Sequence, residues 1–185
     1  MEFIPGRFYH VYNQGNDRQE LFEERTDDYL VFLRLTRRHI LPHVEILAYC
    51  LMPNHFHMMI MTDERCLKTR MSGKIQINEV SFGYKKLLSS YTRIVNKRRG
   101  RSGSLFRQGT HARCLEDESG VTLTGNERQD DLLNVFRYIH DNPVKSDLVE
   151  NLNEWQYSSY PDYAGHRNGT LINKTLASEY GMGVI

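Results

Sequence analysis

Cysteine is scarce in this chain, and the residues that occur are not spaced as metal ligands or as a disulfide framework. Cys50, Cys66 and Cys114 form an odd set, and no two of them follow the CxxC pattern. Disulfide-rich secreted domains carry an even cysteine framework, and thiolate zinc sites need closely spaced pairs. The sequence therefore argues against both, and we expect a reducing, cytoplasmic setting.

Long hydrophobic runs and a strong net charge are also missing. The longest apolar segments fall far short of the roughly 20 residues that span a bilayer. The opening MEFIPGRFYHVYNQGND has no apolar segment after a basic head, so we expect neither a membrane partner nor a secretory signal. The formal net charge of +1 indicates no partner class, although a nearly neutral protein can still carry a basic face.

The composition that remains suits one compact domain. The chain has 185 residues, of which 39% are hydrophobic and 25% are charged, which is enough for a single core. We find no internal repeat and no low-complexity tract. The expected organisation is one domain over residues 1–150 and a C-terminal tail, residues 151–185, packed on it or extending it.

Hydrophobic periodicity predicts alternating strands and helices. Runs of aromatic and β-branched residues predict strands at Phe8–Asn13, Val44–Leu51, His55–Met61 and about Gly109–Leu115. Apolar residues at helical spacing predict helices at Thr26–His39, about Asn78–Lys97 and Asp130–Asp141. The polar segment Glu116–Gln129 is expected to be a loop, with a small hairpin at Val121–Leu123.

Local signals also predict where two of these helices begin and end. Thr26 or Asp27 would cap the first helix, and Asn142-Pro143 would stop the last one. The resulting order, β-α-β-β-α-β and then another helix, is typical of an α+β ferredoxin-like sandwich, an antiparallel sheet with helices on one face. Many unrelated functions use this fold, so function has to be inferred from particular side chains.

Two histidines share one face of a predicted strand. His55 and His57 are separated by Phe56, and residues two apart on a strand point to the same side. Two neighbouring imidazoles can occupy two positions around a divalent cation, while Phe56 would face the core. The alternative is a chance pattern on a half-buried strand, with each imidazole satisfied by a local hydrogen bond.

Tyr138 and Asn142 are four residues apart on the last predicted helix, which places them on one face. A tyrosine hydroxyl can form a covalent intermediate when a nearby cation assists it, and an amide oxygen is a plausible ligand for magnesium or manganese. The alternatives stay open at this point. Tyr138 would otherwise be one of the 11 tyrosines, half-buried on a helix, and Asn142 would simply precede the helix-stopping Pro143.

A basic stretch from Arg93 to Arg113 contains glycines and no acidic residue. Flexible basic segments with an aromatic side chain suit a phosphate backbone and unstacked bases, although a solvated basic loop has the same composition. We favour nucleic acid. The candidate DNA-binding residues are Arg93, Lys97, Arg98, Arg99, Arg101, Phe106, Arg107 and Arg113.

These features occur in an order that resembles a known family. The segments are YHVYNQGNDRQELF at Tyr9–Phe22, LMPNHFHMMI at Leu51–Ile60, SYTRIVNKRRGRSGSLFRQG at Ser90–Gly109, YIHDNPVKSDLV at Tyr138–Val149 and EWQYSSY at Glu154–Tyr160. Together they resemble the HUH-type single-tyrosine transposases (HUH denotes His, a hydrophobic residue, His), and most closely the REP-associated tyrosine transposases. The resemblance covers almost the whole chain.

The resemblance implies a role for each candidate. His55 and His57 would be metal ligands, Asn142 the third ligand, and Tyr138 the nucleophile, with Mg²⁺ or Mn²⁺ as the cation. The Tyr138 oxygen would attack a phosphodiester and give a 5′-phosphotyrosine link and a free 3′-hydroxyl. This would make the chain a metal-dependent tyrosine DNA nuclease.

The resemblance also implies the partners. Substrates would be single-stranded DNA folded into hairpins of repeated palindromic elements, contacted by the basic loop and by Tyr91 or Phe106. Relatives are commonly dimers, so a homodimer is one expectation. Two rival interpretations stay open: a non-catalytic nucleic-acid-binding module on the same fold, and a metallohydrolase whose cation activates water.

Overall fold

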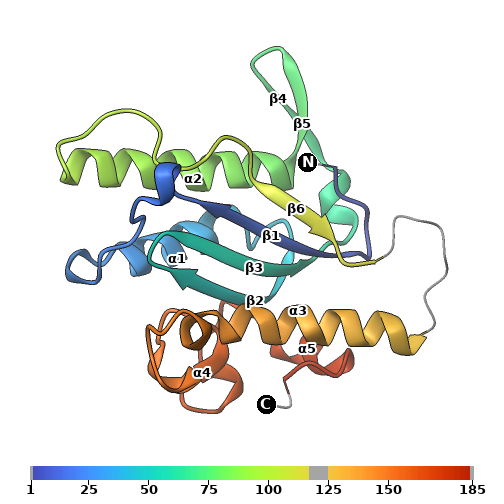
Figure 1. Ribbon diagram of the computed structural model, residues 1–185. Coiled ribbons are helices and arrows are strands. Elements are labelled where there is room, and N and C mark those ends of the chain that lie inside the picture. Colours follow the sequence, from blue (N-terminus) through green and yellow to red (C-terminus); the bar gives the residue numbers. More distant parts are fainter. Residues whose placement is uncertain (1, 117–124, 184–185) are drawn as a thin grey trace.

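The computed structural model describes residues 2–116 and 125–183, with side chains omitted for 125–130. Its centre is an antiparallel sheet whose strands are β1 (Phe8–Gln14), β2 (Glu45–Met52), β3 (His55–Met61) and β6 (His111–Cys114), in the spatial order β2-β3-β1-β6 (Figure 1). The predicted strands are confirmed to within a few residues. An α+β fold built on a four-stranded antiparallel sheet is therefore established.

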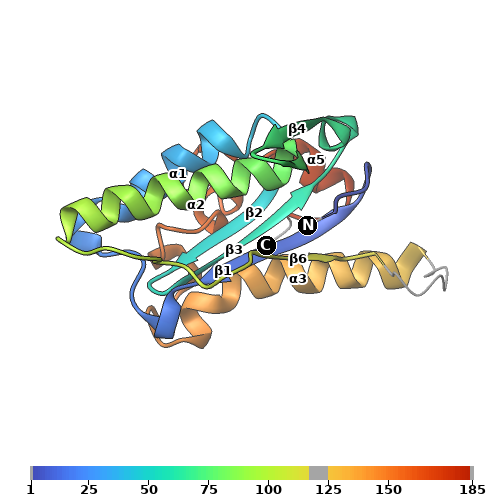
Figure 2. The same ribbon diagram turned by 90° about the horizontal axis from the view of Figure 1, so that it is seen from above.

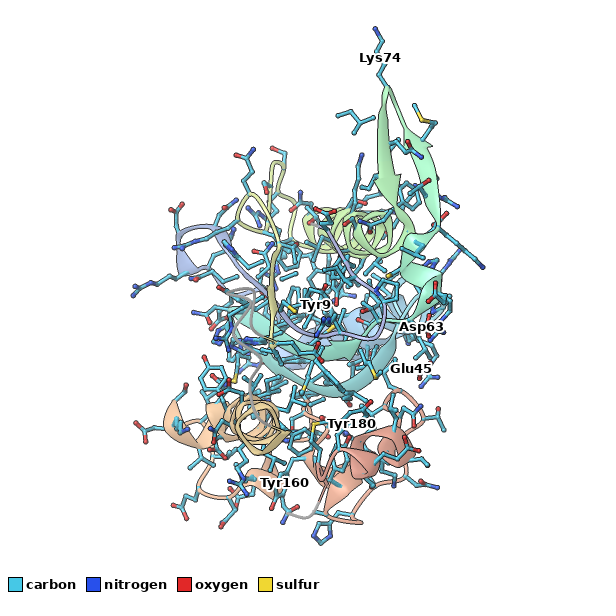
Figure 3. The ribbon with its side chains drawn as sticks, turned by 90° about the vertical axis from the view of Figure 1, so that its right-hand side faces the viewer. Tyr9, Glu45, Asp63, Lys74, Tyr160 and Tyr180 are labelled. Carbon is cyan, nitrogen blue, oxygen red and sulfur yellow. The ribbon has the colours of Figure 1, made fainter. Side chains whose placement is uncertain are left out.

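The helices cover both faces of this sheet, so the prediction of helices on one face is wrong. On one face, α1 (Asp28–His39) and α2 (Glu79–Arg98) lie side by side (Figure 2). On the other face lie α3 (Gly125–Lys145), α4 (Tyr160–Tyr163) and α5 (Lys174–Glu179) (Figure 3). The physical reason is visible in β3, where five consecutive residues from Phe56 to Ile60 are buried. A strand that is buried on both sides needs a cover on both sides.

The structure contains a small hairpin that was not predicted from the sequence. Strands β4 (Thr69–Ser72) and β5 (Ile75–Asn78) pair with each other in a separate two-stranded sheet. The hairpin projects away from the body of the molecule, with Lys74 at its tip (Figure 3). Its strands are short and largely exposed, so they lack the buried alternation that marks a strand in sequence.

Helix α3 is longer at both ends than the sequence predicted. It begins at Gly125, so the predicted loop is wrong for residues 125–129, and the predicted hairpin at Val121–Leu123 lies outside the described residues. The predicted stop at Asn142-Pro143 is also wrong, because Pro143 lies inside the helix. A proline removes only one helical hydrogen bond, and the amide of Ser146 still donates to the Asn142 carbonyl at 3.0 Å.

The beginnings of α1 and α2 differ in how they are capped. Asp27 stands at the capping position of α1, as predicted, but it has a left-handed backbone (φ 57°) and its side chain accepts no capping hydrogen bond. In α2 the Asn78 side chain does cap the helix, accepting from the Ser81 amide at 2.7 Å. Only the second helix start therefore follows the usual chemistry of a polar cap.

The tail after residue 150 lies along β2. The Leu51 amide donates to the Tyr157 carbonyl at 3.0 Å, and the Asn173 amide donates to the Ile46 carbonyl at 2.8 Å. The Ser159 hydroxyl lies 2.7 Å from Nε2 of His140, which ties the tail to α3. Across the described ranges, no helix is long and apolar enough to cross a membrane.

Candidate functional site

The two HUH histidines lie on the face of the sheet that α3 covers. Residue Phe56 points the other way and is fully buried, with its ring 5.1 Å from Phe32 of α1. The prediction that Phe56 faces the core is therefore confirmed. Opposite His57 on β1 stands Tyr12, and opposite Tyr12 on β6 stands His111. The register thus lines up His57, Tyr12 and His111 across three neighbouring strands.

His57 has a second histidine as its hydrogen-bond partner. The Nε2 atom of His10, on β1, lies 2.9 Å from Nδ1 of His57, and both side chains are buried. In the part of the chain that the structure describes, the other ring nitrogen of His57, Nε2, is buried and has no hydrogen-bond partner. A buried nitrogen without a partner is costly unless a ligand satisfies it. His57 is therefore arranged with one nitrogen held and the other available.

Burial keeps this cluster of imidazoles uncharged. Desolvation, assisted by the neighbouring His55 and His10, lowers the pKa of His57 to about 2. Desolvation also lowers the pKa of His10 to about 4, assisted by the positive charge of Arg113. The pKa of His55 is lowered by burial as well. Neutral imidazoles carry the lone pair that a metal ion requires, so the three histidines have the protonation state of metal ligands at neutral pH.

His55 completes the pair. Its ring lies 4.9 Å from that of His57, and its Nδ1 atom lies 2.6 Å from the Asn54 side-chain oxygen. That contact fixes the ring, because Nδ1–H donates to the amide oxygen and Nε2 keeps its lone pair. Among the described side chains, no group of three or more His, Cys, Asp or Glu is arranged to hold a metal ion. His55 and His57 are therefore two candidate donors without a third such side chain arranged beside them in the described part of the chain.

The ring of Tyr138 lies beside the rings of His57 and His10. Its ring centroid is 5.4 Å from that of His57 and 6.0 Å from that of His10, in edge-to-face orientation. The side chain is 43% exposed, although it belongs to a helix whose neighbouring Ile139 is fully buried. Lys145, two turns further along α3, places its ammonium 5.9 Å from the ring centroid. That ammonium also pairs with Asp141 at 3.1 Å. The phenol is thus exposed and lies beside two neutral imidazoles, a position from which it can reach a ligand in the site.

Asn142 does not join the histidines in this structure. Its side-chain amide donates to the Tyr138 carbonyl at 2.6 Å, within α3 itself. The residue is nearly buried and lines neither of the two clefts described next. The helical spacing that predicted a common face for Tyr138 and Asn142 is thus reflected in a direct contact between them, while the metal-ligand role of Asn142 stays a prediction.

Two adjoining clefts meet at the site. The larger, of about 1230 Å³, runs along α3 and β6, and the smaller, of about 500 Å³, lies at the start of β3. Four side chains line both clefts: Tyr12, His57, His111 and Tyr138. The candidate nucleophile and one candidate ligand therefore stand at the junction, where an extended ligand would pass from one cleft into the other.

The predicted basic residues separate into two groups. Arg107 lines the smaller cleft and Arg113 the larger one. By contrast, Arg98 and Arg99 both pair with Asp28, a fully buried carboxylate at the start of α1. Asp28 is distant from both arginines in the sequence but contacts them in the folded protein. Arg98 and Arg99 therefore join α2 to α1 through ion pairs. This engagement argues against their predicted role in binding DNA, which stays a prediction.

Phe106 and Tyr91 were predicted to contact DNA, and the structure places both in the core. Phe106 is 4% exposed and packs near Phe56 and Tyr91. The Tyr91 hydroxyl donates to the Leu21 carbonyl at 2.6 Å. Little of either ring is exposed, although Phe106 lines a cleft together with Arg93 and Arg107. The predicted contact with DNA stays a prediction. Arg93 and Lys97 are exposed on α2 and Arg101 is half-buried, and their predicted role in binding stays a prediction.

Sequence reasoning missed the other side chains of the site, namely His10, Tyr12, Arg18 and His111. The signal for His10 and Tyr12 was present, since they alternate along β1 as His55 and His57 do along β3. This alternation places His10 and Tyr12 beside the histidine pair only when the pairing of β1 with β3 is known.

The fold is shared with a solved structure. A REP-associated tyrosine transposase bound to a REP hairpin matches with a TM-score of 0.59 and 15% sequence identity, over 94% of this chain and 92% of that chain. At this identity the likeness shows a common fold. No protein-family model matches the chain, and no curated protein matches it.

Proposed function

We propose that this chain is a transposase-like single-stranded DNA endonuclease and strand transferase that acts through a 5′-phosphotyrosine intermediate. The observation that carries the proposal is the position of Tyr138, exposed at the junction of two clefts with its ring 5.4 Å from that of His57. The shared fold supports it, because the neighbouring structure is a tyrosine transposase bound to a REP hairpin. The proposed substrates are single-stranded DNA hairpins of repeated palindromic elements.

The proposed cofactor is Mg²⁺ or Mn²⁺. His55 and His57 would hold it. The Nε2 atom of His57, which has no hydrogen-bond partner among the described residues, supports this assignment. Such cations retain several waters and take oxygen ligands from substrate phosphates, so two protein ligands suffice to place one. Asn142 would serve as a third ligand if its amide turned away from the Tyr138 carbonyl. A bound cation would polarise the phosphodiester and offset the charge that develops in the transition state.

The chain's own residues would carry out the transfer. The phenol of Tyr138 loses its proton and its oxygen bonds to phosphorus. The bond from phosphorus to the 3′-oxygen breaks, and that oxygen gains a proton. The products are a 5′-phosphotyrosine and a free 3′-hydroxyl, and the reverse attack rejoins strands.

Labelled hairpin oligonucleotides with single-stranded flanks test this proposal, using repeated imperfect palindromes from the source genome. With Mg²⁺ or Mn²⁺ the wild-type protein should form a DNA adduct that survives denaturing electrophoresis, and Tyr138→Phe should form none. Cleavage that persists in Tyr138→Phe would favour a metal-activated water. Binding without cleavage under either metal would favour a non-catalytic nucleic-acid-binding module.

Three further assignments accompany this proposal. The sequence of elements and the strand order β2-β3-β1-β6 support a ferredoxin-like classification of residues 1–150. A homodimer and a cytoplasmic location are proposed on the resemblance stated above and stay predictions.

A further inference from the structure

An aromatic pair at the site has no part in the proposed chemistry. The rings of Tyr12 and His111 are stacked, with centroids 5.0 Å apart and planes 17° from parallel. Tyr12 is half-buried and His111 is exposed, and both line the two clefts. Strand pairing fixes the arrangement, because Tyr12 and His111 are direct partners in the β1–β6 register. On its other side the Tyr12 ring lies 5.0 Å from that of His10, so the pair forms an aromatic platform whose exposed ring is that of His111.

The two clefts beside this platform differ in charge. Arg18 and Arg107 line the smaller cleft, and none of its lining residues is acidic. The larger cleft contains Arg113, but also Glu116 and Asp131. A polyanion would therefore be held more favourably in the smaller cleft. The platform forms one boundary of that cleft, next to its guanidinium groups.

We propose that the Tyr12–His111 platform stacks an unpaired base of the DNA strand whose phosphate lies beside Tyr138, while Arg18 and Arg107 hold the phosphates next to it. Flat aromatic faces beside positive groups are the usual means of binding single-stranded nucleic acid, because every base has a face that can stack. The inference rests on the proposed function for the placement of the phosphate. It adds the residues that would hold the strand on one side of that phosphate.

The stacking step can be measured without cleavage. Fluorescence anisotropy in EDTA would compare a labelled oligothymidine of 12 nucleotides with a 12-unit deoxyribose-phosphate strand that carries no bases. The two probes have the same charge and differ only in what can stack. Wild-type protein should bind the base-containing strand about tenfold more tightly, since a stacked base contributes on that order. His111→Ala and Tyr12→Leu should each reduce this preference severalfold and leave the affinity for the baseless strand nearly unchanged.

Two control variants separate stacking from charge and from damage to the fold. His166→Ala removes an exposed histidine that lines neither cleft and should retain the full preference. Arg107→Gln should weaken both probes by the same factor, because it removes a phosphate contact only. Perturbation of the His111 imidazole signals in NMR spectra on addition of oligothymidine gives a second measurement that needs no variant.

Equal affinity of the wild-type protein for the two probes would overturn the platform, and so would a preference that survives in both His111→Ala and Tyr12→Leu. Either result leaves the adduct assay untouched, so the platform can fail while the proposed cleavage stands. Conversely, loss of the preference in the two variants together with no adduct on any hairpin would support the platform and refute the cleavage. Binding of neither probe would overturn the inference outright.

Discussion

The Nε2 atom of His10 lies 2.9 Å from the Nδ1 atom of His57, so the first strand of the chain supports the histidine pair on the third. Only one of these nitrogens can carry the shared hydrogen. If His57 is to offer its Nε2 to a cation, its Nδ1–H must donate to His10. In the proposed metal site His10 would therefore be a positioning residue that accepts from Nδ1–H of His57.

Removal of this contact should weaken metal binding. His10→Ala is expected to lower the affinity for Mn²⁺ by about 10- to 100-fold, the usual cost of losing the partner of a ligating histidine. His10→Gln should restore part of the loss, because its amide oxygen can accept the same hydrogen bond. Titration with Mn²⁺, followed by electron paramagnetic resonance, measures both. Unchanged affinity for Mn²⁺ in His10→Ala would show that His10 does not support metal binding.

The stability of the protein should fall in mild acid, in part because of His140. Burial lowers the pKa of His140 to about 3, against an ordinary value of 6.5. Above pH 6.5 the residue is neutral in both states and stability does not depend on its titration. As the pH falls from 6.5 towards 3, the unfolded chain binds a proton that the native state excludes, so the free energy of unfolding decreases by up to about 1.4 kcal/mol per pH unit.

Urea unfolding at pH 7, 6, 5 and 4 checks this expectation. His140→Gln should show a shallower loss of stability with falling pH than the wild-type protein, whatever its stability at pH 7. His166→Gln, at an exposed position, is the matched control and should follow the wild-type curve. Identical pH dependence in His140→Gln and the wild type would show that His140 does not resist protonation in the folded protein.

Two arginines of the basic stretch should behave in opposite ways. Arg99 pairs with buried Asp28 at 3.0 Å and donates to the Glu20 carbonyl at 2.8 Å. Arg99→Gln should therefore lower the free energy of unfolding by about 1–3 kcal/mol and leave the dependence of DNA affinity on salt unchanged. Arg107→Gln should leave stability nearly unchanged and reduce the salt dependence by about one phosphate contact. Unchanged stability and a reduced salt dependence in Arg99→Gln would instead show that Arg99 contacts DNA.

Much of the fold follows from local patterns in the sequence. The apolar run in His55–Met61 reflects burial on both sides of a strand, and the helical spacing in Glu79–Arg98 reflects burial on one side of a helix. Such patterns are visible without knowing the packing partner. The end of α3 was not predictable in this way. Pro143 is an ordinary stop signal, and the hydrogen bond from Ser146 to Asn142 that continues the chain past it is not visible in the sequence.

The site was predictable in part for the same reason. His55 and His57 carry a signal within one strand, and Tyr138 was singled out by resemblance. His10, Tyr12 and His111 join them only through the register of β1 with β3 and β6, which the sequence does not disclose. Likewise, the pairing of Arg99 with Asp28 joins residues 71 positions apart, so a stretch without acids looked free to bind DNA.

The covalent link at Tyr138 is the central claim, and peptide mapping tests it most directly. The protein would be incubated with a hairpin oligonucleotide and Mn²⁺, digested with nuclease and protease, and analysed by tandem mass spectrometry. The account predicts a nucleotide joined through its 5′-phosphate to the phenol of Tyr138, and no modified peptide from Tyr138→Phe. Cleaved DNA with an unmodified Tyr138, or a nucleotide on another tyrosine, would contradict it.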